Sequence, residues 1–425
     1  MTIEFETPKP ILNQQVMLKT VAENMMRSVS REFDENEHSI PWDYVEFMHT
    51  AMKAAGGGGL TVNEETSPLT ALPEGEGNKK RPPIGYQKLA AQIEMLSWGD
   101  VGMYLITPGG GLGAAAVAAA GSPEQKEKFL ERFNGEKPTY AAMCMTEAGA
   151  GSDTSAIRTR AILDEATQEW VINGEKIFVT GGDKSFTEYE KLGKGFIVVW
   201  ASIDPSAGRS GMRAFVIESG TPGVKINKLE HKMGIRVSDT AAISLVDVRV
   251  PYDNVLGSPT VERNTAGFKG AMATFDATRP LVAASGIGVA RAALEFLKEK
   301  LEENGVKTRY GLPRQKLSNI EREVIDMEIM VKSAWLMVLK AVWMADNKKP
   351  NALESSMCKV KAGDVTTKVT QKVVELLGPL GYSREFLAEK WFRDAKITDI
   401  YEGTGQINRM VVARHILGYS GAELR

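Results

Sequence analysis

The stretch "EWVINGEKIFVTGG", residues 169–182, carries the alternation of β-branched, aromatic and polar residues that a β-strand needs. Within it, Asn173-Gly174 is the strongest hairpin signal in the chain, because a tight two-residue turn requires positive φ at both positions. We therefore expect a hairpin with its turn at this pair. Similar short runs lie on both sides between residues 138 and 251: "TYAAMCMTE", "IRTRAIL", "KGFIVVWASI", "GMRAFVIE", "GVKINKLE" and "AISLVDVRVP". Their spacing predicts an all-β unit.

The flanks of this unit have the apolar periodicity of helices. Ser122 and Gln125 form the pattern of a capping box before one of them. A long helix is expected to open at Pro280 and to end at Gly305. Residues 54–83 are rich in Gly, Pro and charge, which indicates an inserted loop or lid. The sequence thus predicts a mainly α chain with a central β-domain, divided into residues 1–137, 138–256 and 257–425.

The bulk composition limits the classes of partner. The chain has 52 basic and 54 acidic residues and a formal net charge of -2, which gives no reason to expect a nucleic acid or a membrane surface. Its two cysteines, Cys144 and Cys358, form no disulfide framework and no zinc-site spacing. The longest small-apolar run, "LGAAAVAAAG", is too short to span a bilayer. We expect a cytoplasmic protein without a metal site or a membrane span.

Two glycine-rich segments are candidates for ligand binding. "GGGLGAA", from Gly109, fits a dinucleotide fingerprint but lacks the βαβ unit that such a site needs. "TEAGAGSD", from Thr146 to Asp153, can expose backbone N–H groups to a phosphate or a polar ring edge, although an ordinary glycine turn explains it equally well.

Three other segments have both a structural and a functional interpretation. In "FVTGG", Phe178 and Thr180 share one face of a strand, and packing in the core is the better explanation for Phe178 taken alone. In "FDATRP", Asp276 and Arg279 fit a helix cap and a surface charge. In "DIYEGTGQINR", residues 399–409, Glu402 is either a charge at a helix start or a base presented to a pocket.

Together these segments resemble, in order and over nearly the whole chain, the acyl-CoA dehydrogenase family. The resemblance rests on "MCMTEAGAGSD", "VINGEKIFVTGG", "HKMGIRVSDT", "VRVPYDNVLG", "FDATRP" and "RDAKITDIYEGTGQINR". It implies a helical N-terminal domain, a β-barrel-like middle domain and a C-terminal four-helix bundle. It also implies FAD between the β-domain and the bundle, an acyl-CoA substrate oxidised to a trans-2-enoyl-CoA, an electron-transferring flavoprotein as acceptor, and a homotetramer or homodimer.

The same resemblance assigns roles to individual residues. Glu402 takes the position of the base that removes the α-proton, and its amide is expected to meet the thioester carbonyl. The expected cofactor contacts are Met145, Thr146, Ser152, Phe178, Thr180, Lys307, Arg309, Thr404 and Gln406. The expected substrate contacts are Ser152, Asp276, Thr278, Arg279 and Gly403.

The chain departs from the family pattern where the family grips the FAD of a neighbouring subunit. Lys307 stands where an arginine is usual, Ser318 where a glutamine is usual, and "ELLGPLG" brings Glu375 and Pro379 into a glycine-rich segment. These departures leave two alternatives: a catalytically altered or silent subunit of a heteromer, and an oxidase on the same scaffold. Glu230 matches a docking position for the electron acceptor, although a solvated surface charge explains it as well.

Overall fold

The computed structural model describes residues 7–54, 83–261, 266–419 and 423. The predicted insertion at 54–83 lies almost entirely outside the described residues. The N-terminal part is helical, as predicted. Its helices are α1 (Lys9–Val21), α2 (Ser30–Glu35), α3 (Trp42–Ala54), α4 (Gly85–Leu105), α5 (Gly111–Ala120) and α6 (Pro123–Leu130), with a π-helical turn at Ala22–Arg27. The predicted capping box is present, because Ser122 and Gln125 exchange hydrogen bonds at the start of α6.

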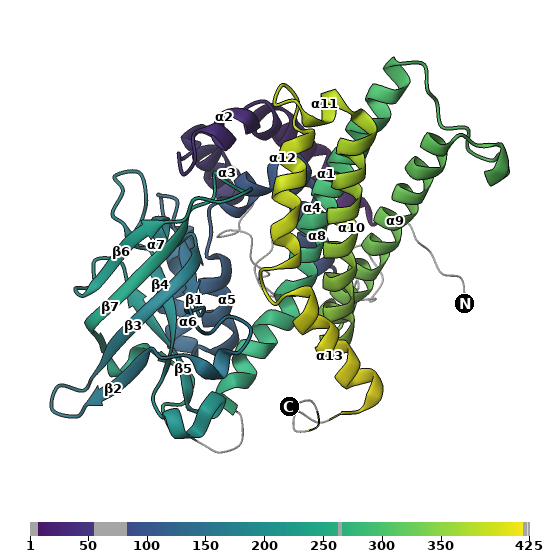
Figure 1. Ribbon diagram of the computed structural model, residues 1–425. Helices are drawn as coiled ribbons and strands as arrows, with labels where there is room; N and C mark the ends of the chain where they lie inside the picture. Colours follow the sequence, from purple (N-terminus) through teal and green to yellow (C-terminus); the bar gives the residue numbers. More distant parts are fainter. Residues whose placement is uncertain (1–6, 55–82, 262–265, 420–422, 424–425) are drawn as a thin grey trace, which may run out of the picture.

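The middle of the chain forms one eight-stranded sheet, seen on the left of Figure 1. Its hydrogen-bonded order is β6-β7-β3-β2-β4-β5-β8, and β1 pairs in parallel with β4. The strands are β1 (Ala141–Cys144), β2 (Arg160–Asp164), β3 (Glu169–Thr180), β4 (Phe196–Ser202), β5 (Met212–Glu218), β6 (Val224–Leu229), β7 (Thr240–Pro251) and β8 (Val255–Leu256), with the short helix α7 (Gly182–Phe186) after β3. All seven predicted strand segments are confirmed. The exact domain limits remain a prediction.

The sheet buries side chains on both faces. On β4, Phe196 and Val198 pack with residues of α5 and α6, whereas Ile197 and Val199 pack with side chains of β3 and β7. Strand side chains turn toward opposite faces with a period of two, so a fully apolar strand such as β4 must be covered twice. The sheet meets this need by carrying α5 and α6 on one face and by packing side chains of β3, β4, β5 and β7 with one another on the other.

The predicted hairpin at Asn173-Gly174 is wrong. β3 runs unbroken from Glu169 to Thr180, and its pairing with β7 shifts register between Ile172 and Gly174. Gly174 has φ +156, and a Cβ there would come within 2.4 Å of the Thr159 hydroxyl. The Asn173 side chain exchanges hydrogen bonds with Asp247 on β7. The Asn-Gly pair thus forms a bulge where β3 passes close to Thr159, directly before β2. In a sequence, an Asn-Gly pair looks the same whether it forms such a bulge or a hairpin turn.

The C-terminal part is a helical bundle, on the right of Figure 1. It comprises α8 (Ala266–Glu303), α9 (Asn319–Asp346), α10 (Ala352–Leu377), α11 (Pro379–Tyr382), α12 (Ala388–Ala395) and α13 (Gly405–Leu417). The predicted start of α8 at Pro280 is wrong, because the helix begins at Ala266 and Pro280 lies inside it. Proline removes one backbone donor without forbidding a helix that packing holds in place. The predicted end is confirmed, since Gly305 follows the helix with φ +76.

The helices of the two ends of the chain share one hydrophobic core. Residues of α4 pack with residues of α8, α9, α10 and α12 in a single cluster. α4 and α8 approach closely at Gly288, where a Cβ would lie 2.2 Å from the Glu94 carbonyl oxygen. Part of α8, Asp276–Glu303, is long and apolar enough to cross a membrane by length and composition, but 72% of its most apolar window is buried in the protein.

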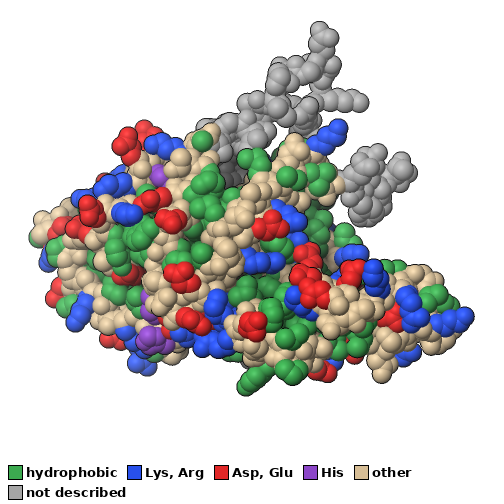
Figure 2. Space-filling view, turned by 90° about the horizontal axis from the view of Figure 1, so that it is seen from above, with side chains coloured by type: hydrophobic (Ala, Val, Ile, Leu, Met, Phe, Trp, Pro, Cys, Tyr) green, Lys and Arg blue, Asp and Glu red, His purple; other side chains and the backbone are tan. Residues whose placement is uncertain are grey.

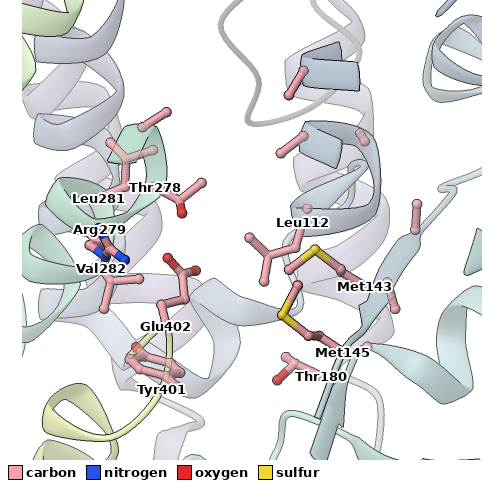
Figure 3. Close-up of a pocket in the computed structure, with 18 of the residues that line it drawn as sticks. Leu112, Met143, Met145, Thr180, Thr278, Arg279, Leu281, Val282, Tyr401 and Glu402 are labelled. Atoms are coloured by element: carbon pink, nitrogen blue, oxygen red, sulfur yellow. The ribbon is translucent and has the colours of Figure 1, made fainter. Parts of the chain in front are cut away.

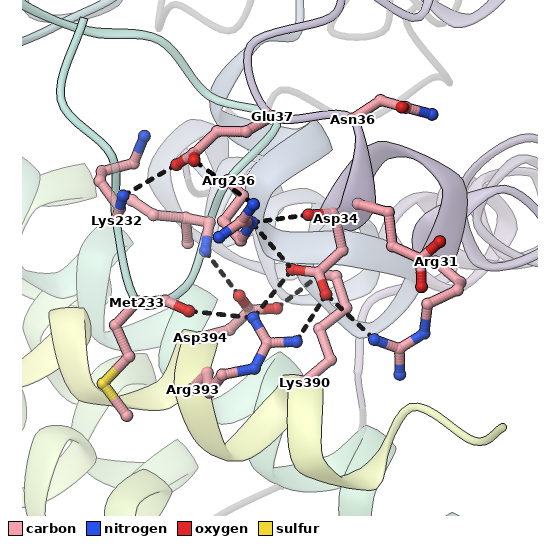
Figure 4. A network of polar contacts seen from close by, with 12 residues as sticks. Arg31, Asp34, Asn36, Glu37, Lys232, Met233, Arg236, Lys390, Arg393 and Asp394 are labelled. Carbon is pink, nitrogen blue, oxygen red and sulfur yellow. Dashed lines mark hydrogen bonds and ion pairs between the residues drawn. The ribbon is translucent and has the colours of Figure 1, made fainter. Parts of the chain in front are cut away.

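A buried network of charges joins three parts of the chain (Figure 4). Lys390 on α12 forms ion pairs with Asp394 on the same helix at 2.7 Å and with Asp100 on α4 at 2.8 Å. Asp394 also accepts a hydrogen bond from the backbone amide of Ile235, in the loop between β6 and β7. Arg393 pairs with Asp34 on α2. The network therefore ties the N-terminal helices, the β-domain and the bundle together directly before the segment that carries Glu402.

Charges of both signs are intermixed on the face of the molecule seen in Figure 2.

Cys144 and Cys358 are free and buried.

Replacing Lys390 with methionine should destabilise the fold strongly. The substitution leaves Asp100 and Asp394 buried without their counter-ion, and breaking a buried pair in this way costs about 3–5 kcal/mol. The matched control is Lys191→Met, because Lys191 pairs with Glu46 between the β-domain and α3 with both side chains about half exposed. Its loss should change stability by about 1 kcal/mol or less. Urea unfolding followed by tryptophan fluorescence compares the two, and equal effects would contradict the structural role of the network.

Candidate active site

A cavity of about 1120 Å³ lies between the β-domain with α5 and the C-terminal bundle. Pockets for drug-sized ligands usually measure about 300–1,000 Å³, so this cavity lies slightly above that range. Figure 3 shows Thr278, Arg279, Leu281, Val282, Tyr401 and Glu402 on one wall and Leu112, Met143, Met145 and Thr180 on the opposite wall. The two walls come from segments far apart in the sequence and face each other across a gap.

Glu402 projects into this gap from a short loop before α13 (Figure 3). The loop is tight, because Glu402 has φ +53 and Gly403 has φ +95. A left-handed conformation at a residue other than glycine costs about 1–3 kcal/mol and often marks a functional site. Thr404 follows as the N-cap of α13, with its hydroxyl accepting a hydrogen bond from the Ile407 amide. The loop thus turns the carboxylate into the cavity before the helix can start.

The surroundings of Glu402 oppose its ionisation in part. Burial raises the pKa of the Glu402 carboxyl above its ordinary value, while the Thr278 hydroxyl, Lys359 and Arg279 counter that rise. The Oε2 atom of Glu402 and the Oγ1 atom of Thr278 are buried. Neither atom makes a hydrogen bond of regular geometry with a described residue, although the Thr278 hydroxyl lies close enough to Glu402 to lower its pKa. Buried polar atoms are usually satisfied, so two such atoms on one cavity wall fit contact with a ligand.

The opposite wall presents hydroxyls and one exposed aromatic ring. Thr146, Phe178 and Thr180 line the cavity, as does Met145. The preference for Phe178 in the core is wrong, because its side chain is 60% exposed. Phe178 has φ +56 at a second irregularity of β3, between Lys176 and Val179, which turns the ring away from the strand core. Such a bulge re-aims a side chain toward a site.

A buried ion pair between Lys176 and Glu147, which the sequence analysis did not predict, supports the loop that begins at Thr146. Lys176 Nζ donates to the Met145 carbonyl at 3.0 Å and to Glu147 Oε1 at 2.8 Å. Glu147 also accepts from the amides of Arg158 and Thr159. Although burial opposes it, this set of donors holds the pKa of Glu147 below its ordinary value. The sequence did contain a hint of this pair: Lys176 falls on the same alternation of strand positions as Trp170 and Ile172, whose side chains point inward.

The structure brings together most of the predicted substrate contacts. Ser152, Thr278, Arg279 and Gly403 line the same cavity as Glu402. Asp276 does not line it, but its carboxylate pairs with Arg279 at 2.7 Å and orients that side chain.

Four predicted cofactor contacts do not reach this cavity within one chain. Lys307 pairs with Glu302, and Arg309 pairs with Glu321, both at the far end of α8 and α9. Thr404 caps α13, and the exposed Gln406 does not line the cavity. Single-chain geometry therefore assigns these four residues no contact with a ligand beside Glu402.

The positions that depart from the family pattern have local structural roles. Ser318 caps α9 in a capping box with Glu321. Glu375 pairs with Lys372 on the bundle surface, and Pro379 begins α11.

One group of potential metal ligands occurs among the described residues, outside the cavity. Ligand atoms of Glu37, His38 and His231 lie within 4.8 Å of one another. Glu37 already accepts hydrogen bonds from the Lys232 amide and pairs with Arg236. The positive charge beside it disfavours a cation, so we assign no metal to this group.

The fold and the cavity define a three-part architecture, in which a β-domain and a helical bundle enclose a space with a carboxylate on one wall. Family models for the acyl-CoA dehydrogenase N-terminal, middle and C-terminal domains match residues 13–136, 142–248 and 265–417. The chain belongs to the acyl-CoA dehydrogenase family and is an oxidoreductase.

Similar proteins agree with this assignment. Acryloyl-CoA reductase (NADH) of Anaerotignum propionicum is 37% identical over 323 residues, 76% of each chain. Mouse mitochondrial short-chain specific acyl-CoA dehydrogenase is 38% identical over 298 residues, 70% of this chain and 67% of the relative. The structure of butyryl-CoA dehydrogenase from Megasphaera elsdenii superposes with a TM-score of 0.81 at 28% identity, over 98% of this chain and 100% of that one.

Phe178→Asn should leave thermal stability unchanged or raise it. Asparagine adopts the left-handed conformation more readily than phenylalanine, which offers relief of about 1 kcal/mol, and the exposed ring has little packing to lose. Val179→Asn is the matched control, because it places an amide in the core and should cost about 1–3 kcal/mol. Differential scanning calorimetry of both variants tests this. A drop for Phe178→Asn as large as for the control would mean that Phe178 serves stability.

Proposed function

We propose that this protein oxidises an acyl-CoA thioester to a trans-2-enoyl-CoA with FAD, and that Glu402 removes the α-proton. The observation that carries the proposal is the half-buried Glu402, whose buried Oε2 atom makes no regular hydrogen bond with a described residue and which faces, across a cavity, a wall of hydroxyls and one exposed ring. A thioester that enters between the two walls would meet this carboxylate on one face.

The cavity fits a flavin on the wall opposite Glu402. Phe178 offers a ring face for stacking, and the hydroxyls of Thr146 and Thr180 offer hydrogen bonds to a polar ring edge. When bound, the flavin supplies the acceptor for the β-hydrogen, which leaves as hydride while the proton goes to Glu402 and the Cα–Cβ double bond forms.

The main chain beside Glu402 supports its role. Among the described residues no acceptor bonds to the Glu402 amide, so this N–H can donate to the thioester carbonyl oxygen. A donor at that oxygen acidifies the α-carbon because it stabilises the negative charge that develops there. The raised pKa of Glu402 brings the base closer to neutral pH, where it is most effective.

We further propose that the acyl group is short. Leu89 and Ile93 on α4 and Leu281 and Val282 on α8 are apolar residues that line the cavity, and we take these four residues as its floor. Next to Ile93 along α4, Glu94 lies in close contact with Gly288 of α8, so the two helices are tightly packed there. Similar proteins are named for short-chain acyl-CoA, butyryl-CoA and acryloyl-CoA, which supports the same size class.

For the electron acceptor we propose an electron-transferring flavoprotein. One similar chain, with a TM-score of 0.80 at 29% identity, comes from a structure described as the electron transferring flavoprotein of Acidaminococcus fermentans. We also propose a cytoplasmic homotetramer or homodimer, with a role in acyl-CoA breakdown by β-oxidation. Two buried free thiols agree with a reducing compartment.

Glu402→Gln should abolish most of the activity without changing the fold. Proton transfer by a positioned base contributes about 10²–10⁴-fold, so kcat should fall by at least that factor. Acyl-CoA oxidation with an artificial electron acceptor measures the loss, and calorimetric binding of the enoyl-CoA product shows that the pocket survives. Wild-type activity should rise with pH through the Glu402 pKa, because the base must be deprotonated. Undiminished turnover by the variant would rule out this base.

The same preparation separates the alternatives. Protein that is colourless and takes up no added FAD would support a silent subunit. Reoxidation of the flavin by oxygen at turnover speed would support an oxidase.

A panel of acyl-CoA substrates should show the highest kcat/KM at four carbons. Each methylene that the floor of the cavity excludes should lower kcat/KM by about 10-fold or more. Ile93→Ala should move the optimum to longer chains, because it opens the floor, while Leu312→Ala on the exposed α8–α9 connection should leave the profile unchanged. A wild-type optimum at long chains would contradict the assigned floor.

A further inference from the structure

Lys359 on α10 differs from the other buried lysines. Among the described residues four lysines are no more than 2% exposed: Lys176, Lys184, Lys359 and Lys390. Three of them form ion pairs with carboxylates at 2.5–2.8 Å. Lys359 forms no ion pair within 4.0 Å with any described carboxylate. An ammonium buried without a close counter-ion is costly, so its presence calls for another reason.

The partner of Lys359 is the backbone next to Glu402. Its Nζ donates to the Gly403 carbonyl oxygen at 3.1 Å. The Asn408 side chain donates to the same oxygen at 2.8 Å. Two buried donors thus hold the carbonyl that follows Glu402, in a loop whose consecutive left-handed residues are unfavourable by themselves. The two hydrogen bonds fix the turn that aims Glu402 into the cavity.

The charge of Lys359 acts on the same loop. The charged or titratable groups that face it are Glu402 and Asp399 from the loop, Arg279 from α8 and Cys358 from α10. Burial lowers the pKa of Lys359 to about 8, so the ammonium remains protonated at neutral pH. A cation here favours the ionised form of Glu402, against the burial that favours the neutral form.

We propose that Lys359 is a positioning residue for Glu402: its ammonium holds the Gly403 carbonyl and so the catalytic turn, and its charge keeps the Glu402 carboxylate ionised. This inference rests on the proposed role of Glu402 as the base. Arg279 shares the electrostatic part of this role. Lys359 combines a contact with the turn and a charge on the carboxylate.

Two substitutions separate the two effects. Lys359→Met removes the donor and the charge, whereas Lys359→Gln retains a donor, on a side chain one bond shorter, without the charge. Both should move the acidic limb of the pH profile of kcat/KM to higher pH, because Glu402 then binds its proton more tightly. In addition, Lys359→Met should lower kcat by about 10–10²-fold at the pH optimum, as expected for a slightly displaced base. Lys359→Gln should lower it less, and KM should change little in either.

The control is Lys372→Met, on the same helix but at the surface, where Lys372 pairs with Glu375. Its pH profile should match the wild type. A purely structural role of Lys359 would lower the melting temperature and leave the acidic limb in place, and that result would overturn the proposal. Should Lys359→Met fail to fold, the pH profile of Lys359→Gln decides. An unshifted limb together with an inactive Glu402→Gln variant would refute this inference alone, whereas an active Glu402→Gln variant would refute the proposed function.

Discussion

A carboxylate that a tight loop turns into a cavity is the constraint on which the rest of this structure depends. Burial raises the pKa of Glu402, which means that the carboxyl group favours its neutral form unless nearby groups stabilise the ionised form. The protein supplies Lys359 and Arg279 near the carboxylate and fixes the loop in two left-handed residues. A helix start alone would have exposed the charge to solvent. The loop instead turns it toward a cavity whose other wall belongs to a different domain.

That arrangement divides the work among three parts of the chain. The β-domain forms the wall with Thr146, Phe178 and Thr180. The buried Glu147–Lys176 ion pair holds the loop of this wall in place. The bundle provides the wall with Glu402, and α4 lines the cavity with Leu89 and Ile93. Because the site lies between domains, small movements of one against another would change the distance between its walls. The buried charges around Lys390 resist such movements (Figure 4).

The order of elements follows from strand alternation and helical periodicity, because both patterns record burial directly. The predicted residues that line the cavity are assigned by the resemblance to the family and not by these patterns. The misjudged positions are those where tertiary contacts decide. Asn173-Gly174 forms a bulge because a neighbouring strand approaches at Thr159, and Pro280 lies within α8 because packing tolerates one missing donor. The Phe178 side chain lies outside the core because β3 bulges at this residue. In the sequence, Lys359 has the pattern of an ordinary helix residue. Only the fold shows that its side chain contacts Gly403, forty-four positions later in the chain.

The central claim is that Glu402 takes a proton from the carbon next to the thioester carbonyl. Incubating the protein with FAD and an acyl-CoA in D₂O, without an electron acceptor, tests this directly through ¹H NMR of the α-carbon. The account predicts deuterium at that carbon with the wild type, and none with Glu402→Gln although the ligand still binds. Exchange at the wild-type rate in the variant would contradict it.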